Sequence, residues 1–208
     1  MKIRVVGDVH GKYGEYLNVV DDAEYSIQVG DMGFDYEHMK GLDPLKHVFI
    51  GGNHDNYDEI EKCHHCHGNW GMRHLGNGAQ GEVFKYFVAR GAYSIDKKYR
   101  TTGFDWWTGE EMNHVTANKC LRSYTKNKPD IVISHDCPTI LVPEFITNAG
   151  KMTPSFTGEL LNTMFKINKP KLWIFGHHHN NKTVERLGTK FVCLDELAFM
   201  DIDTEKEL

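Results

Sequence analysis

The pattern that decides the fold is clearest in residues 48–55, which read Val-Phe-Ile-Gly-Gly-Asn-His-Asp. An apolar run at 48–50 is closed by two glycines and followed by polar side chains that can bind metals. Short β-branched and aromatic runs closed by turn residues are typical of buried strands. We therefore predict a strand that ends near residue 50 and presents Asn53, His54 and Asp55 at its carboxyl end.

The same pattern occurs four more times along the chain. Apolar runs at 5–6, 27–29, 131–133 and 172–175 each lead through one small residue to a carboxylate or an imidazole. The side chains presented in this way are Asp8 and His10, Asp31, His135, and His177, His178 and His179.

Stretches with helical spacing of apolar residues separate several of these runs, at 13–23, 108–126 and 156–167. Alternating strands and helices indicate a layered α/β fold. Ligands of such sheets gather beyond the carboxyl ends of the strands, so the five strand ends predict one shared site. Further along, we expect two antiparallel strands over 82–96 that turn near Arg90-Gly91. We also expect a hairpin of 183–187 with 190–194 through Gly188-Thr189, and a frayed acidic tail over 201–208.

Length and composition narrow the class of protein. The chain has 208 residues, of which 40% are hydrophobic and 25% charged, which is a globular composition that fits a single domain over 1–208. No apolar run approaches the roughly 20 residues that span a bilayer, so we expect no membrane partner. A net charge of -5 argues against stable binding of duplex nucleic acid, which needs cationic side chains.

The number of cysteines indicates in which cellular compartment we expect the protein. Five cysteines are an odd number, and the first residues reach Gly7 and Asp8 too early for a signal peptide. Both features favour a reducing environment, and we expect a cytoplasmic protein.

The strand ends offer carboxylates, imidazoles and one amide oxygen, but no thiolate. This chemistry suits a catalytic Mn, Fe or Zn site better than a closed zinc site of cysteines. Asp31 can bridge two dications. Ions roughly 3.5–4 Å apart can generate hydroxide at neutral pH and clamp both oxygens of an in-line displacement at phosphorus. The seven candidate ligands are Asp8, His10, Asp31, Asn53, His135, His177 and His179.

Five blocks of the sequence, in order, resemble the calcineurin-like metallophosphoesterases, whose pattern is D-x-H, G-D, G-N-H-[D/E], H and G-H-x-H. Here the blocks are Asp8-Val9-His10, Gly30-Asp31, Gly51-Gly52-Asn53-His54-Asp55, His135 and Gly176-His177-His178-His179. The resemblance implies a four-layer α/β/β/α sandwich with mixed sheets and a di-metal site at the carboxyl ends of the strands. It also implies two divalent ions, with Mn expected first and Fe, Zn or Ni as alternatives.

The resemblance also assigns roles to these positions. It implies a first metal held by Asp8, His10, Asp31 and His179, and a second held by Asp31, Asn53, His135 and His177. A hydroxide bridging the metals would attack phosphorus in line. His54 would act beside the leaving group as a general acid or transition-state stabiliser, and Asp55 would orient it.

The opening Gly7-Asp8-Val9-His10-Gly11 is similar to that of Ser/Thr protein phosphatases, but the second block lacks their Asp-Arg-Gly and the third ends in Asp rather than Glu. These departures argue against a protein phosphatase. The segment from Gly91 to Glu111 looks like that of small microbial and viral members. We expect a phosphoester substrate and a phosphomonoesterase first. The alternatives are a phosphodiesterase or nuclease on cyclic nucleotides or nucleic acid, and a non-catalytic binding module.

Further residues carry open alternatives. Arg100 is the candidate phosphate clamp, because a guanidinium matches phosphate oxygens, or it pairs with Glu110 or Glu111. His178 is a loop residue at the mouth of the site or a contact to substrate. Cys137 is expected to pack rather than react.

Trp106 and Trp107 anchor a helix start or stack on a base. Cys63 and Cys66, with nearby histidines, form an exposed loop or a zinc site. Four cationic residues are expected on the solvated face of a helix: Lys119, Arg122, Lys126 and Lys128.

Overall fold

The computed structural model of the chain describes residues 2–62, 72–80, 86–146 and 155–203. Within these ranges the strands form two five-stranded sheets. The first sheet has the order β10-β1-β2-β3-β4, in which β1 to β4 are parallel and β10 is antiparallel to β1. Its strands are β1 (Lys2–Val6), β2 (Ser26–Gln28), β3 (His47–Ile50), β4 (Arg73–Leu75) and β10 (Phe199–Asp203).

The second sheet has the order β5-β6-β7-β9-β8 and repeats this plan, with four parallel strands and β8 antiparallel at the edge. Its strands are β5 (Tyr86–Ala89), β6 (Ile131–Ser134), β7 (Leu172–Phe175), β8 (Lys182–Arg186) and β9 (Thr189–Cys193). Both sheets are therefore mixed, as predicted.

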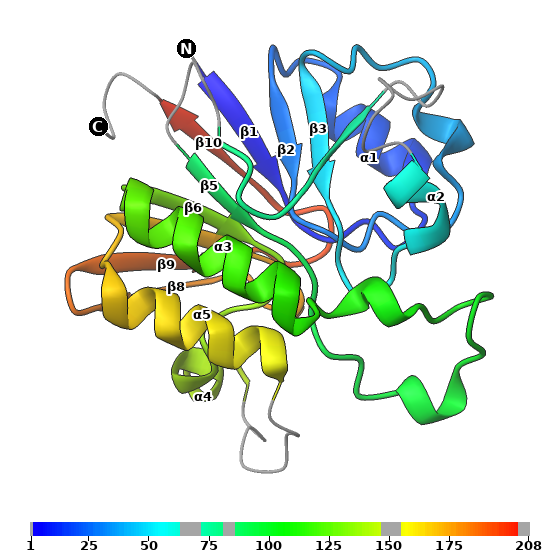
Figure 1. Ribbon diagram of the computed structural model, residues 1–208. Helices are drawn as coiled ribbons and strands as arrows, with labels where there is room; N and C mark the ends of the chain where they lie inside the picture. The colour runs from blue at the N-terminus through cyan, green and yellow to red at the C-terminus, as the bar shows by residue number, and fades with distance from the viewer. Residues whose placement is uncertain (1, 63–71, 81–85, 147–154, 204–208) are drawn as a thin grey trace.

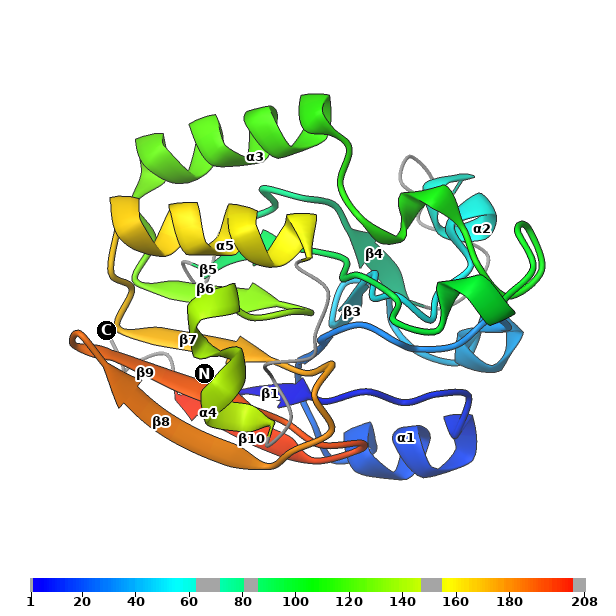
Figure 2. The same cartoon turned by 90° about the horizontal axis from the view of Figure 1, so that it is seen from below.

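Helices cover the outer faces of the two sheets (Figure 1). Helices α1 (Tyr13–Val20) and α2 (Tyr57–Lys62) lie beside the first sheet, and α3 (His114–Asn127), α4 (Val142–Phe145) and α5 (Phe156–Ile167) lie beside the second. Figure 2 shows α3 and α5 side by side over the second sheet. Short 3-10 turns occur at η1 (Tyr36–Met39), η2 (Lys97–Tyr99), η3 (Thr108–Glu110) and η4 (Thr139–Leu141).

Three apolar clusters lie between the four layers. Neighbouring residues of a strand point to opposite faces, so Val5 enters the cluster between the sheets while Val6 packs with Tyr16 of α1. In the second sheet, Ile131 faces the central cluster and Val132 faces the helices. Strands buried on both faces are continuous apolar runs, which is why 131–133 and 172–175 are readable in the sequence.

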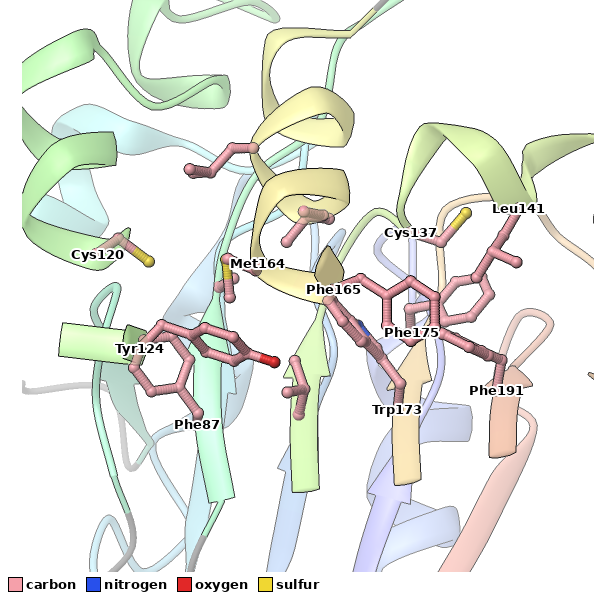
Figure 3. Close-up of a cluster of buried hydrophobic side chains, with 14 of the residues drawn as sticks. Phe87, Cys120, Tyr124, Cys137, Leu141, Met164, Phe165, Trp173, Phe175 and Phe191 are labelled. Atoms are coloured by element: carbon pink, nitrogen blue, oxygen red, sulfur yellow. The ribbon is translucent and has the colours of Figure 1, made fainter. Parts of the chain in front are cut away.

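The cluster under α3 and α5 is rich in aromatic side chains (Figure 3). The rings of Trp173 and Phe191 stack with centroids 5.6 Å apart, and Phe165 of α5 meets Phe191 edge-on at 5.1 Å. Rings in such contacts contribute stability beyond the area they bury. The four-layer α/β/β/α arrangement expected from the sequence is confirmed, and the carboxyl ends of β1, β2, β3, β6 and β7 lead into one region.

The predicted antiparallel pair over 82–96 is wrong. β5 ends at Ala89 and pairs in parallel with β6, and the chain from 90 to 96 contains no strand. Gly91 has φ +86°, and a Cβ there would lie 2.2 Å from the Glu110 carbonyl oxygen. The glycine thus permits close contact between two segments rather than a hairpin turn.

The predicted helix over 108–126 is broken into η3 and α3. Glu111 is extended at φ -105°, ψ 150°, and Asn113 caps α3 by accepting a hydrogen bond from the Thr116 N–H. The break has a tertiary cause, since the Glu111 carboxylate accepts the Thr157 N–H at 3.1 Å, at the start of α5.

The end of the chain also differs from expectation. Residues 201–203 are not frayed but belong to β10, where Ile202 is buried and pairs with Ile3. The C-terminal hairpin is confirmed as β8 and β9, with its turn at Leu187 and Gly188, whose φ angles are 51° and 81°. None of the helices in the described ranges is long and apolar enough to cross a bilayer.

Candidate metal centre

Six of the seven predicted ligands fall into two compact groups. The outer group is Asp8, His10 and His179, and the inner group is Asp31, His135 and His177. Within each group, one ligand atom per residue lies within 4.8 Å of the others. Each group contains three of the four ligands in one of the two sets that the sequence resemblance implies.

Asp31 lies between the two groups. One carboxylate oxygen, Oδ2, is 3.6 Å from Nε2 of His10 in the outer group. The other, Oδ1, is 3.2 Å from Nε2 of His135 in the inner group. A carboxylate with one oxygen facing each group has the geometry of a bridging ligand.

Asn53, the seventh predicted ligand, joins the inner group. Its side-chain oxygen Oδ1 is 3.0 Å from Nε2 of His135, and the residue is only 4% exposed. The structure therefore brings together all seven side chains that the strand-end pattern predicts.

The backbone at this site is held in an unfavourable conformation. Seven non-glycine residues of the described ranges have positive φ, and four of them are predicted ligands: His10 (48°), Asp31 (58°), His177 (64°) and His179 (45°). Left-handed backbone at a non-glycine residue costs about 1–3 kcal/mol and tends to cluster at functional sites. This concentration indicates that the side chains are oriented for function rather than for stability.

Two glycines allow the loops to approach each other. A Cβ on Gly52 would lie 2.2 Å from Oδ1 of Asp31, and one on Gly176 would lie 2.0 Å from Oδ1 of Asp8. These positions are therefore closed to any side chain while the carboxylates stay in place.

The donor set fits a cation. Nδ1 of His135 lies 2.9 Å from the Val29 carbonyl oxygen, which can only accept, so this nitrogen carries the proton. In the neutral ring that a metal requires, the lone pair on Nε2 would then face two acceptor oxygens, of Asp31 and Asn53. Three acceptors pointing at one another repel unless a positive charge lies among them.

The outer group shows the same arrangement. Nε2 of His179 lies 3.3 Å from Nε2 of His10, and both lie near Oδ2 of Asp8, at 3.6 and 3.7 Å. Nδ1 of His179 is 3.1 Å from the Glu196 carboxylate. Carboxylate partners of this kind fix the tautomer of metal-binding histidines, leaving Nε2 free for the ion.

The pKa values report the same concentration of negative charge. Burial of His135 disfavours its charged form, but the Asp31 carboxylate outweighs burial and raises the pKa of His135 to about 10. Burial would raise the pKa of Asp31, yet the imidazoles of His135, His54 and His10 lower it below its ordinary value. The site attracts positive charge even before any metal is considered.

His54 lies at the edge of the outer group. Its ring centroid is 5.2 Å from that of His10, and the residue is half-buried. Its backbone N–H donates to Oδ1 of Asp31 at 2.6 Å, while burial lowers the pKa of its imidazole. A neutral, partly exposed imidazole beside the predicted ligands is in reach of a group bound there.

Asp55 does not fit the role of orienting His54. Its carboxylate accepts backbone N–H bonds from Asp31 (2.9 Å), Met32 (3.1 Å), Gly33 (3.3 Å) and Gly52 (2.7 Å), and the Tyr36 hydroxyl at 3.1 Å. Among the described residues no bond joins this carboxylate to the His54 ring. Asp55 instead clamps the loops after β2 and β3 to each other.

Arg100 is not a phosphate clamp. Its guanidinium is only 6% exposed and donates to the Asn53 carbonyl oxygen and the Ser94 hydroxyl, while its Nη2 lies 3.1 Å from the Glu110 carboxylate. The alternative expectation, an ion pair with Glu110, is the correct one. The residue type alone could not show that the nitrogens of the Arg100 guanidinium already have partners within the protein.

His178 is also removed from the mouth of the site. Its side chain is 3% exposed, and Nε2 lies 3.3 Å from both the Cys137 thiol and the Asp136 carboxylate. Its expected substrate contact is therefore unsupported. Burial raises the pKa of the Cys137 thiol well above its ordinary value, which agrees with the expectation that Cys137 packs rather than reacts.

The remaining alternatives resolve toward structural roles. Trp107 is buried beside α2, where its ring N–H donates to Asp58 at 3.0 Å. Trp106 is half-buried, and Nζ of Lys97 lies 4.1 Å from the centroid of its ring. The four cationic residues expected on a solvated surface are exposed: Lys119, Arg122, Lys126 and Lys128. The possible zinc site at Cys63 and Cys66 lies outside the described residues.

Sequence reasoning missed Glu196 and Ser94. Glu196 follows β9 just as the predicted ligands follow their strands, so the same pattern, extended to residues 191–196, could have found it. Ser94 has no comparable signal, because its contact with Asn53 depends on the tertiary fold.

Known proteins resemble this chain in sequence and in fold. A lariat debranching enzyme from Entamoeba histolytica is 24% identical over an alignment of 255 residues, which covers 95% of this chain and 69% of that enzyme. Among solved structures, phosphopantetheinyl hydrolase (PptH) from Mycobacterium tuberculosis matches with a TM-score of 0.56 at 12% identity, covering 100% of this chain and 97% of its own. The protein TT1561 of Thermus thermophilus matches with a TM-score of 0.55 at 12% identity, covering 100% and 96%.

A family model for the calcineurin-like phosphoesterases, whose members use divalent metal ions, matches residues 1–181. This span contains every strand end that builds the outer and inner groups. The chain therefore belongs to the calcineurin-like phosphoesterase family and, with it, to the phosphoric ester hydrolases.

Proposed function

We propose that the chain hydrolyses phosphomonoesters with the help of two divalent cations, one held by the outer group and one by the inner group. The observation that carries this proposal is Asp31, whose two oxygens face the two groups at 3.6 and 3.2 Å. A single carboxylate shared in this way favours a pair of ions over two independent sites.

Manganese is the ion we propose first, with Fe, Zn or Ni as alternatives. Imidazole, carboxylate and amide ligands without a thiolate suit these borderline ions. When bound, a pair of such ions lowers the pKa of water and neutralises charge on the phosphate oxygens.

The chain's own residues supply position and proton transfer. Asp31, Asn53, His135 and His177 would hold the inner cation, and the outer group with Asp31 would hold the other. His54 is proposed to donate a proton to the leaving oxygen or to stabilise its charge, because its partly exposed imidazole lies beside His10.

The outer group defines where the substrate enters. The side chains of His10 and His179 are 22% and 42% exposed, whereas those of Asp31 and His135 are 1% and 0% exposed. A phosphate can therefore reach the site from the outer side. With a net charge of -5, small phosphorylated molecules are favoured over long polyanions as substrates, and no stable duplex binding is expected.

The second candidate function is a phosphodiesterase. The observation that favours it is the relative named a lariat debranching enzyme, whose alignment covers 95% of this chain. Paired monoester and diester substrates separate the two candidates.

A cytoplasmic location is proposed on the thiol chemistry. Cys120, Cys137 and Cys193 are buried free thiols in the described residues, as expected for a reducing compartment.

The first experiment measures hydrolysis of p-nitrophenyl phosphate before and after thorough chelation, followed by re-addition of Mn. We expect activity to be lost on chelation and restored by Mn. Unchanged turnover in the chelated protein would contradict the proposal. The same assay on bis(p-nitrophenyl) phosphate separates a monoesterase from a diesterase, and no turnover on either ester, without bound metal, would favour a binding module.

The role of His54 is tested with a series of phenyl phosphates whose leaving groups differ in pKa. We expect His54→Ala to slow poor leaving groups far more than good ones, because only poor ones need a proton. Equal, small effects along the whole series would refute the role.

A further inference from the structure

A buried polar cluster lies behind Asn53, on the side opposite His135. It consists of Ser94, Arg100 and Glu110, all from the segment between β5 and α3. Ser94 and Glu110 are 3% and 2% exposed, and the Arg100 side chain is 6% exposed. Burying two charges and a hydroxyl costs free energy unless the groups are fully paired. We therefore expect the cluster to have a role beyond packing.

The cluster holds Asn53 at two points. The side-chain amide nitrogen of Asn53 donates to the Ser94 hydroxyl at 3.1 Å. Both terminal nitrogens of Arg100 donate to the Asn53 carbonyl oxygen, each at 3.1 Å. The fork of the guanidinium thus fixes the backbone, while Ser94 fixes the side chain.

The three cluster residues also bind one another. The Ser94 hydroxyl donates to Oε2 of Glu110 at 2.6 Å and accepts from Nη1 of Arg100 at 2.6 Å. Nη2 of Arg100 lies 3.1 Å from Oε1 of Glu110, which also accepts the Trp107 backbone N–H at 3.3 Å. Every charged group in the cluster has a partner.

These bonds decide which way the Asn53 amide faces. A hydroxyl has one hydrogen, and Ser94 donates it to Glu110, whose carboxylate, ionised in its pair with Arg100, can only accept. Ser94 can therefore only accept from Asn53, so the amide nitrogen must face Ser94 and the oxygen must face His135. An amide turned the other way would place two acceptors against each other and remove the oxygen from the inner group.

We propose that Ser94, Arg100 and Glu110 are positioning residues that lock the Asn53 amide with its oxygen toward the inner cation. This inference rests on the proposed function, because it assigns the cluster to the inner of the two proposed ions. It also gives the buried Arg100 guanidinium a role, because its fork holds the Asn53 backbone carbonyl.

The test is a calorimetric titration of Mn into the metal-free full chain, comparing wild type with Ser94→Ala. The small, buried hydroxyl is removed while the carbon skeleton stays, so the amide loses the acceptor that fixes its orientation. Losing a partner of a metal ligand lowers metal affinity about 10–100-fold. We expect that loss at one of two sites, with the other unchanged.

Arg100→Lys provides a second variant that keeps the charge but loses the fork, and we expect it to weaken the same site. Arg4→Lys is the matched control, since Arg4 is also a paired arginine, bonded to Asp201 and Asp22 away from the site. Both Mn affinities should be unchanged in the control. Thermal unfolding of each metal-free variant reports any general loss of stability.

The outcomes are distinguishable. Wild type with two Mn sites, and Ser94→Ala and Arg100→Lys with unchanged affinities at both, would overturn the positioning inference and leave the proposed function standing. Equal weakening of both sites together with a lower Tm would assign the cluster to the fold alone and also overturn it. A wild-type chain that binds fewer than two Mn ions would overturn the proposed function and this inference with it.

Discussion

The outer and inner groups are built from the same types of side chain but differ in their surroundings. In the inner group the side chains of Asp31 and His135 are 1% and 0% exposed, and His135 is held by a backbone carbonyl. In the outer group His179 is 42% exposed and is held by Glu196, which is itself 30% exposed. The inner half is part of the core, whereas the outer half, whose Asp8 is also buried, faces solvent through His10 and His179.

Rigidity and access are therefore divided between the two halves of the site. Buried ligands with backbone partners keep one geometry, whereas exposed ligands with side-chain partners allow substrate to approach and ions to exchange. Asp31 belongs to both halves of the site. We therefore expect the substitution of Asp31 itself to have the largest effect.

The largest effect is expected from Asp31→Asn, because this substitution removes the negative charge that both groups share. We expect kcat/KM on the better p-nitrophenyl substrate to fall about 1000-fold, which corresponds to about 4 kcal/mol. The metal content should fall from two ions toward one or none. Asp130→Asn is the control, because Asp130 is an exposed carboxylate paired only with Lys171 at the far end of β6 among the contacts described. A loss below tenfold in Asp31→Asn would show that activity does not depend on a carboxylate shared by the two groups.

A direct contrast between the halves comes next. His135→Ala should lower activity about tenfold more than His179→Ala, a difference of about 1.4 kcal/mol, because the inner position is dry and rigid. Added imidazole should restore part of the activity of His179→Ala, whose position is open to solvent, and none in His135→Ala. Equal losses and equal rescue would show that burial does not distinguish the two halves.

The sequence predicts the inner and outer groups well because each ligand follows its own strand. The apolar runs at 48–50 and 131–133 identify local structure, and parallel strands bring their carboxyl ends together without further information. The four-layer fold follows from the same runs, whose alternating residues, such as Val5 and Val6, serve two different cores.

The rest of the site depends on contacts between distant residues. Arg100 is read as a phosphate clamp from its chemistry, but only the fold shows that Glu110 and the Asn53 carbonyl occupy its fork. The helix predicted over 108–126 has good local signals, yet Glu111 is drawn to the start of α5 and breaks it. β10 is missed because its acidic residues suggest a free tail, whereas pairing with β1 orders residues 199–203.

Asp55→Asn tests the clamp between the loops after β2 and β3, which carry Asp31 and Asn53. The carboxylate accepts four backbone N–H groups and one hydroxyl, and an amide can replace only part of these bonds. We expect the free energy of unfolding to fall by about 3 kcal/mol, because hydrogen bonds to a charged group are lost in the core. Urea unfolding of the metal-free chain measures this, with Asp130→Asn again as the control. Asp55 would instead orient His54 if the Asp55→Asn variant kept its stability but its hydrolysis rates changed with the pKa of the leaving group in the same way as those of His54→Ala.

The smallest effect is expected from Glu196→Gln, which changes only the support of the outer group. The amide keeps an acceptor for Nδ1 of His179 but loses its charge, so the outer ion should bind about tenfold more weakly. The inner ion should be unaffected in the same Mn titration. Weakening of the inner rather than the outer ion would contradict the division of the site into these two groups.

If Asp31 holds a pair of cations, one in each group, crystals of the chain grown with Mn should show both ions by anomalous diffraction. We expect two anomalous peaks, one beside His10 and one beside His135, separated by roughly 3.5–4 Å with the Asp31 carboxylate between them. A single peak, or peaks that do not contact Asp31, would contradict it.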